Sequence, residues 1–236
     1  RMERAEAFLK TLDPPKLAEA PGGRAYQTAD TAVLDRGRAA FAGTCARCHS
    51  SKQPPAEMAT DPAKVTAWFR EAVRQPGFLD GNFLSDDKRH AVSVIGTNIA
   101  RAAATNAMAG HVWAQFSSET YKQQPAIGRL TTLYNPRKPT EPLAFTLEGG
   151  GRGYYRTPSL GGIWATAPFF HNNALGIYVK DPSVAGRMAA FMDAVEKLLW
   201  PERRLGVQSI PVTSIDSSLV LANGHRRDPR SSGGSQ

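Results

Sequence analysis

The two cysteines of this 236-residue chain lie close together, and a histidine follows the second one directly. They occur in the pentapeptide Cys45-Ala46-Arg47-Cys48-His49. Two thiols at this spacing can form a redox-active disulfide, supply half of a zinc site or attach a covalent cofactor. Zinc needs about four ligands, usually from two such pairs, and the chain has no second pair. A redox pair is typical of a βαβ context, whereas this pair follows an alanine-rich helical pattern.

The third chemistry, covalent attachment of a c-type haem, accounts for all three side chains. Each thiol adds to a haem vinyl group, and the two-residue gap between the cysteines matches the distance between the vinyls. The imidazole that follows is placed beneath the iron as its proximal ligand. The pentapeptide therefore predicts one haem c, with Cys45 and Cys48 as attachment points and His49 as an iron ligand.

A helix is expected to lead into this pentapeptide. Its apolar positions recur at helical spacing, and Asp30 or Thr31 can cap its start. These positions are Val33, Leu34, Gly37, Ala40 and Phe41. A glycine inside a helix costs about 1 kcal/mol relative to alanine, so Gly37 predicts the close approach of another helix.

Further helices are expected over residues 2–12, 62–75, 97–116 and 182–200, from their periodicity and from Asp-Pro starts at residues 61 and 181. Residues 121–162 are rich in Pro and Gly and show no strand alternation. The predicted fold is all-α, a cytochrome c-like helical domain with long irregular loops around a covalent haem. We expect an N-terminal arm (1–30), a mono-haem domain (31–205) and an extended C-terminal tail (206–236).

A second stretch, residues 149–176, carries a resemblance to a known superfamily. It contains YRTPSL at 155–160 and APFFHN at 167–172. These motifs resemble a signature of the bacterial di-haem cytochrome c peroxidase superfamily, which includes the rubber-oxygenase-like cytochromes. The similarity extends over roughly residues 31–205. In such cytochromes, a glycine lets the C-terminal helix cross the first helix and an aromatic side chain packs on the haem edge. Gly37 and Phe41 occupy those places.

One departure from this superfamily bears on function. Its members carry two haems, whereas this chain has one attachment motif and resembles only their C-terminal, electron-entry half. The single haem favours one-electron transfer, by a carrier or by the cytochrome subunit of a larger redox complex, over catalysis. The alternatives are a haem peroxidase or oxygenase with an open iron site and His171 as an acid or base, and a structural haem-bearing docking module.

The second axial ligand of the iron remains open between two leading candidates, Met188 and His171. In the peroxidase group, the histidine that matches His171 lies beside the haem, and a methionine about fourteen residues later binds the iron. Met188 and Met192 share one helix face and are equally suited to core packing. Met192, His111 and His225 are lesser candidates.

The chain has a formal net charge of +8, and residues 91–180 carry eight Lys/Arg against three Asp/Glu. No basic run of the kind that binds nucleic acid is present. A basic face suits an acidic redox protein as partner. Arg152 and Arg156 are candidate partners of the haem propionates, with surface positions as the alternative. The sequence contains no run of 18 apolar residues, so no transmembrane segment is predicted.

The chain begins at Arg1 rather than Met, so we expect it to be processed or a fragment of a longer protein. Because thioether attachment of haem is completed outside the bacterial cytoplasm, the motif implies a periplasmic or otherwise extracytoplasmic location.

Overall fold

The computed structural model describes residues 2–9, 11–95, 102, 118–132, 134–135, 138–142, 152–169, 175–204 and 218–221. The chain divides into two compact units. The first unit consists of Arg1–Asp86 and Pro158–Ile210, and the second of Asp87–Thr157 and Pro211–Gln236.

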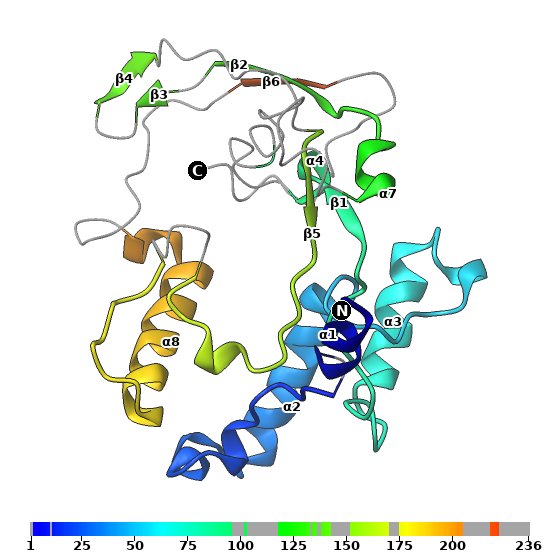
Figure 1. Cartoon of the computed structure of the whole chain (residues 1–236). Coiled ribbons are helices and arrows are strands. Elements are labelled where there is room, and N and C mark those ends of the chain that lie inside the picture. The colour runs from blue at the N-terminus through cyan, green and yellow to red at the C-terminus, as the bar shows by residue number, and fades with distance from the viewer. Residues whose placement is uncertain are drawn as a thin grey trace. The chain divides into compact units, whose positions relative to one another are not determined.

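The first unit is built from helices, which Figure 1 labels along the chain. Its α-helices are α1 (Met2–Leu9), α2 (Thr31–Ala40), α3 (Pro62–Ala72) and α8 (Val184–Leu199). Short 3₁₀ turns connect them: η1 (Leu17–Glu19), η2 (Gly23–Tyr26), η4 (Ala56–Met58), η5 (Ile163–Ala165) and η6 (Pro201–Arg204). A π-helical turn, η3 (Phe41–Cys45), continues α2 directly.

Helix α2 begins where the sequence predicts. The Asp30 carboxylate accepts hydrogen bonds from the backbone N–H groups of Ala32 and Val33, so Asp30 is the N-cap. The helix does not stop at Ala40 but widens into η3, in which the Ala46 N–H donates to the Phe41 carbonyl 2.8 Å away. The chain thus passes from a capped helix into the first cysteine without a loop.

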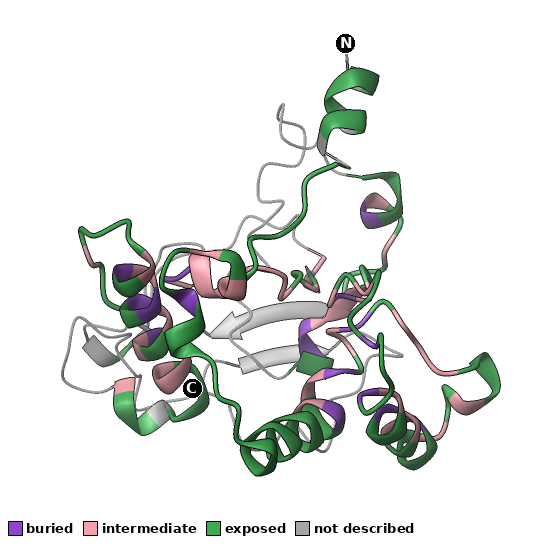
Figure 2. Cartoon of the chain, turned by 90° about the horizontal axis from the view of Figure 1, so that it is seen from below, coloured by how far each residue is buried: buried purple, intermediate pink, exposed green. Residues whose placement is uncertain are grey.

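Helix α3 contributes Val65 and Phe69 to the first hydrophobic core. Asp61 caps it and Pro62 opens it, as predicted, and its buried stripe contains Val65 and Phe69. The whole buried cluster consists of Ala42, Ala46, Val65, Phe69, Val73 and Phe78. Figure 2 shows such buried residues as narrow stripes on otherwise exposed helices. Because Ala42 and Ala46 belong to this cluster, the core packs directly beneath the cysteine pentapeptide.

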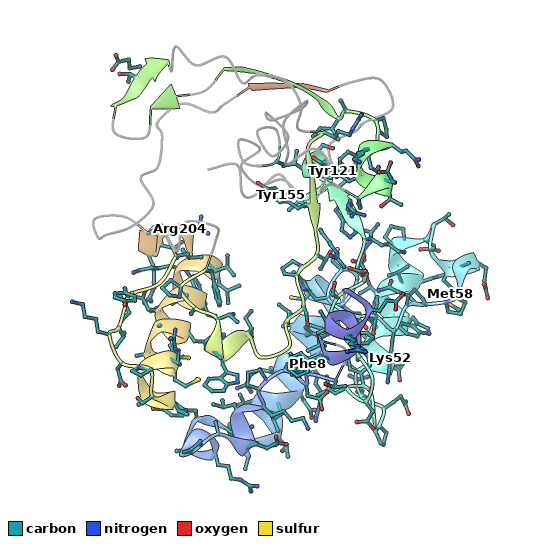
Figure 3. The ribbon with its side chains drawn as sticks, in the orientation of Figure 1. Phe8, Lys52, Met58, Tyr121, Tyr155 and Arg204 are labelled. Atoms are coloured by element: carbon teal, nitrogen blue, oxygen red, sulfur yellow. The ribbon has the colours of Figure 1, made fainter. Side chains whose placement is uncertain are left out.

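Helix α8 starts later than its Asp-Pro sequence predicts. The Ser183 hydroxyl caps it by accepting from the Gly186 N–H, while the Asp181 carboxylate accepts from the Ser183 N–H and hydroxyl. These two bonds lower the pKa of Asp181. At the other end, the Arg204 guanidinium (Figure 3) donates to the carbonyls of Lys197 and Leu198.

A second core of the first unit lies along α8. Ala190 and Ala194 pack with Ala167, and the rings of Phe169 and Phe191 meet edge to face at 6.2 Å between centroids. The Phe169 segment precedes the helix in sequence, so this core ties η5 and its neighbours to α8.

The second unit contains the strands. The described residues form three two-stranded antiparallel sheets: β1 (Arg89–Ala91) with β5 (Tyr154–Arg156), β2 (Gly128–Thr132) with β6 (Ser218–Leu221), and β3 (Tyr134–Asn135) with β4 (Lys138–Pro142). Two short helices accompany them, α4 (Val92–Ile95) and α7 (Glu119–Lys122). The prediction of an all-α fold is therefore wrong, because the Pro/Gly-rich region pairs into short ladders instead of staying irregular.

The core of the second unit is small. Val92, Ala102 and Ile127 are buried, and Tyr154 and Tyr155 pack against them. Next to Tyr154, Gly153 has φ +83 and leaves no room for a Cβ beside Ile127, so only glycine fits there. Tyr121, labelled with Tyr155 in Figure 3, accepts a hydrogen bond from the Arg152 N–H.

The predicted helix over residues 97–116 lies outside the described residues, apart from Ala102. Of the helices that the structure describes, none is long and apolar enough to cross a membrane. The predicted division into residues 1–30, 31–205 and 206–236 stays a prediction.

Candidate haem-binding site

The pentapeptide forms a single helical turn at the end of η3. The Cys45 carbonyl accepts from the Cys48 N–H at 3.2 Å and from the His49 N–H at 2.8 Å. Residues three and four apart on such a turn lie on the same side, so the two thiols and the imidazole share one side. Both cysteines are half-buried free thiols. Burial, with a smaller contribution from the neighbouring Cys48, raises the pKa of the Cys45 thiol.

The imidazole of His49 is held by a main-chain atom from far along the chain. Its Nδ1 lies 3.2 Å from the Pro158 carbonyl oxygen, a separation of 109 residues in sequence. A carbonyl oxygen can only accept a hydrogen bond, so Nδ1 must carry the proton. The lone pair of the neutral ring is then on Nε2. This is the tautomer that a metal-ligating histidine adopts when its other nitrogen donates to a carbonyl.

These residues fit a covalently attached haem. Two free thiols at the required spacing stand on one turn with an imidazole whose Nδ1 lies against a carbonyl acceptor, as a metal-bound histidine usually does.

An apolar groove of about 850 Å³ borders the same helix. From α2 it is lined by Val33, Leu34, Gly37 and Arg38, from η3 by Phe41, and on the opposite side by Val73, Phe78, Leu79 and Leu84 among others. Its volume lies within the usual range of cofactor and ligand pockets. Phe41, four residues before Cys45, also touches Phe78 edge to face at 6.4 Å between centroids.

Gly37 does not have the neighbour that the sequence predicts. Among the described residues, no atom lies within 4 Å of the place where its Cβ would be. Helix α2 has no buried residue, and Val33 and Leu34 are 40% and 38% exposed. The apolar stripe of α2 faces the groove rather than a crossing helix.

The structure also shows the surroundings of several other candidate residues. Met188 is buried on α8, whereas Met192, one turn later, is exposed, so the two methionines do not share an environment. Arg152 donates to the Gln124 carbonyl at 2.6 Å, and Arg156 forms an exposed ion pair with Asp87. His171, like His111 and His225, lies outside the described residues.

Sequence reasoning missed two contributors to the site, the Pro158 carbonyl and the side chain of Asn82, which is described below. A carbonyl has no signature in residue type. The available signal for Pro158 was its position inside YRTPSL.

A comparison with known families supports the binding of a haem c by this chain. A family described as "RoxA-like, cytochrome c-like" matches residues 153–175, the segment that contains Pro158. No curated protein and no solved structure matches the chain significantly.

As a class, the chain resembles the cytochromes that bind haem c. More particularly, the match at residues 153–175 confirms its resemblance to the RoxA-like cytochrome c domain, which the motifs in that segment predict.

Proposed function

We propose that this chain carries one haem c, bound through Cys45 and Cys48 with His49 as axial ligand, and that it transfers single electrons. The observation that carries the proposal is the hydrogen bond from His49 Nδ1 to the Pro158 carbonyl. It sets the tautomer that a ligand needs, on the turn that holds both thiols. The RoxA-like match and the cysteine spacing support the same conclusion.

When bound, the haem supplies an iron that cycles between ferric and ferrous states. The residues of the chain control that cycle in three ways. Two thioether links fix the position of the cofactor. The Pro158 carbonyl draws on the Nδ1 proton and thereby raises the basicity of Nε2. Apolar side chains beside the site, Phe41 among them, exclude water and so influence the potential.

Met188 would be the leading candidate for a second protein ligand of the haem iron, with His171 as the alternative. Met188 is only 5% exposed, a burial that suits either a sulfur ligand or core packing. A protein ligand on both faces of the iron suits electron transfer, because no position remains for a substrate.

The partner is proposed to be an acidic redox protein, and the location extracytoplasmic. The surplus of basic residues supports electrostatic steering toward such a partner, either as a free carrier or within a larger complex. Association would then slow as salt increases.

Intact-mass measurement of the denatured chain tests the attachment. The chain expressed with a haem c maturation system should carry the mass of one haem, and the Cys45→Ser/Cys48→Ser variant should carry none. A denatured chain without added mass would contradict the proposal, as would a double variant that keeps its haem.

The optical spectrum then separates a carrier from a catalyst. A low-spin spectrum that does not change with peroxide, cyanide or carbon monoxide is expected for electron transfer. A high-spin spectrum with rapid peroxide turnover would instead assign the chain to haem peroxidases or oxygenases.

A further inference from the structure

One side chain, Asn82, joins the loop that follows His49 to a second loop about thirty residues later. Its Oδ1 accepts from the Ser51 N–H at 2.9 Å, the Ser51 hydroxyl at 3.2 Å and the Leu84 N–H at 3.0 Å. Its Nδ2 donates to the Ser50 hydroxyl oxygen at 3.0 Å and to the Phe78 carbonyl at 3.3 Å. Asn82 thus uses both ends of its amide to bind the two loops together.

The first end of this link is adjacent to the imidazole. Ser50 follows His49 directly and is fully buried. Its hydroxyl donates to the Lys52 carbonyl at 2.8 Å and accepts from the Lys52 N–H at 3.1 Å. Lys52 (Figure 3) in turn donates from Nζ to the Gly77 carbonyl at 2.7 Å. The backbone on the C-terminal side of His49 is therefore fixed to the loop around Asn82.

The second end reaches the acceptor of His49. The Phe83 carbonyl accepts from the Ser159 hydroxyl at 2.6 Å, and the Leu84 carbonyl accepts from the Leu160 N–H at 3.3 Å. Ser159 follows Pro158, whose carbonyl binds His49. These hydrogen bonds and the peptide bonds between neighbouring residues together form a closed ring of contacts. It runs from His49 through Pro158, Phe83 and Asn82 back to Ser50.

The backbone inside this ring is held in an unfavourable conformation. Leu84 has φ +49, in the left-handed region that is unfavourable for a residue other than glycine. Such residues persist where the surroundings over-determine them, and they cluster at functional sites. The bonds that hold Leu84 there are those to Asn82 and Leu160.

We propose that Asn82 is a positioning residue that holds the Pro158 carbonyl against Nδ1 of His49 and thereby tunes the haem iron. The inference rests on the proposed haem ligation by His49. The side-chain amide of Asn82 offers an accepting oxygen and a donating nitrogen on separate atoms, whereas aspartate at neutral pH only accepts. Loss of Asn82 loosens the ring, weakens the Nδ1–H···O bond and makes the imidazole a poorer donor to ferric iron.

The test compares Asn82→Ala and Asn82→Asp with the matched control Gln53→Ala in the haem-loaded protein. Gln53 donates to the Ser50 and Arg47 carbonyls and, within the described part of the chain, forms no hydrogen bond with residues 78–84. We measure the reduction potential and the exchange rate of the His49 Nδ1 proton by NMR. Asn82→Ala should raise the potential and speed exchange about fivefold, the equivalent of one net hydrogen bond. Asn82→Asp, which keeps an accepting oxygen, should speed the exchange of the Nδ1 proton less than Asn82→Ala does, and Gln53→Ala should change neither the potential nor the exchange rate.

Unchanged potential and exchange in haem-loaded Asn82→Ala or Asn82→Asp would overturn this role while leaving haem binding intact. If both Asn82 variants fail to load haem and Gln53→Ala loads normally, Asn82 serves folding in general, and the positioning role is also overturned. A wild-type chain that attaches no haem would instead refute the proposed function.

Discussion

His49 has as its partner an atom that no side-chain substitution can remove. The Pro158 carbonyl belongs to the main chain, so the tautomer of His49 depends on where that segment lies rather than on which residue occupies it. The side chains of Ser159 and Asn82 belong to the hydrogen bonds that position this segment. Mutation can therefore act on the imidazole through these two residues.

The axial assignment makes a prediction about Met188. Leucine fills nearly the same volume as methionine but has no thioether, so Met188→Leu should cost less than about 1.5 kcal/mol of stability. If the Met188 sulfur binds the iron, this variant should lose the weak near-infrared sulfur-to-iron band and lower the reduction potential. Optical spectroscopy of the haem-loaded protein measures the band, and electrochemical titration measures the reduction potential.

Met192→Leu is the matched control, since Met192 is exposed on the same helix. Met192→Leu should leave the near-infrared band and the reduction potential unchanged. A Met188→Leu protein with an unaltered spectrum would remove Met188 from the coordination sphere, and His171→Ala would be the next variant to measure.

Single residues with a local role were predictable. The cap residues Asp30 and Asp61 and the buried Val65 and Phe69 follow from spacing and capping rules that act within one helix. Asn82 was not predictable, because its role depends on five hydrogen bonds to three separate stretches of chain. Its letter in the sequence is that of an ordinary turn residue.

At the scale of elements, α2 and η3 form one continuous helical segment that leads into the proposed haem-binding turn. No residue of α2 is buried, so the stability of this helix depends strongly on its N-cap, Asp30. Ala42 of η3 and its neighbour Ala46 pack into the core beside α3, and this anchors the C-terminal end of α2.

Replacement of Asp30 by Ala should therefore weaken α2. Loss of an N-cap costs about 1 kcal/mol, within a range of roughly 0.5–2 kcal/mol. Chemical denaturation should show this loss in Asp30→Ala, while Asp30→Asn, which keeps an accepting oxygen, should stay close to wild type. Asp35→Ala, which removes only an exposed i,i+3 ion pair with Arg38, is the control. Equal stability of Asp30→Ala and wild type would show that α2 does not need its cap.

The error in fold class also arose at this scale. The strands are two to five residues long, too short for an alternating pattern to emerge from a region rich in Pro and Gly. β2 pairs with β6, whose residues lie some ninety positions later, and such long-range pairing leaves no local trace. The helices, by contrast, have a periodicity of their own, and four of those predicted are present, namely α1, α2, α3 and α8, three of them with shifted ends.

For the molecule as a whole, the notable feature is how much apolar surface the chain leaves uncovered. The groove beside α2 is one such area, and Leu79 on its rim is 67% exposed. An apolar cofactor next to the pentapeptide would cover part of this surface and add to the small cores of the first unit.

The loaded chain should consequently melt at a higher temperature than the haem-free Cys45→Ser/Cys48→Ser variant. Covering about 100 Å² of apolar surface is worth about 2.5 kcal/mol, which corresponds to roughly 5–10 °C in Tm for a chain of this size. Calorimetry measures the shift, and binding of a fluorescent apolar dye should be stronger in the variant. Identical Tm and dye binding would mean that the haem contacts little of the chain.

The contact between His49 and Pro158 also has a consequence for the order of events in biosynthesis. A chain made from its N-terminus presents both thiols and the imidazole more than a hundred residues before the carbonyl that fixes the ring. A nascent or truncated chain ending before residue 158 holds a complete attachment motif without the acceptor for its histidine. Thioether formation needs only residues 45–49, whereas setting the iron ligand also needs the Pro158 segment folded against His49, so we expect attachment to require less of the folded chain than ligand positioning does.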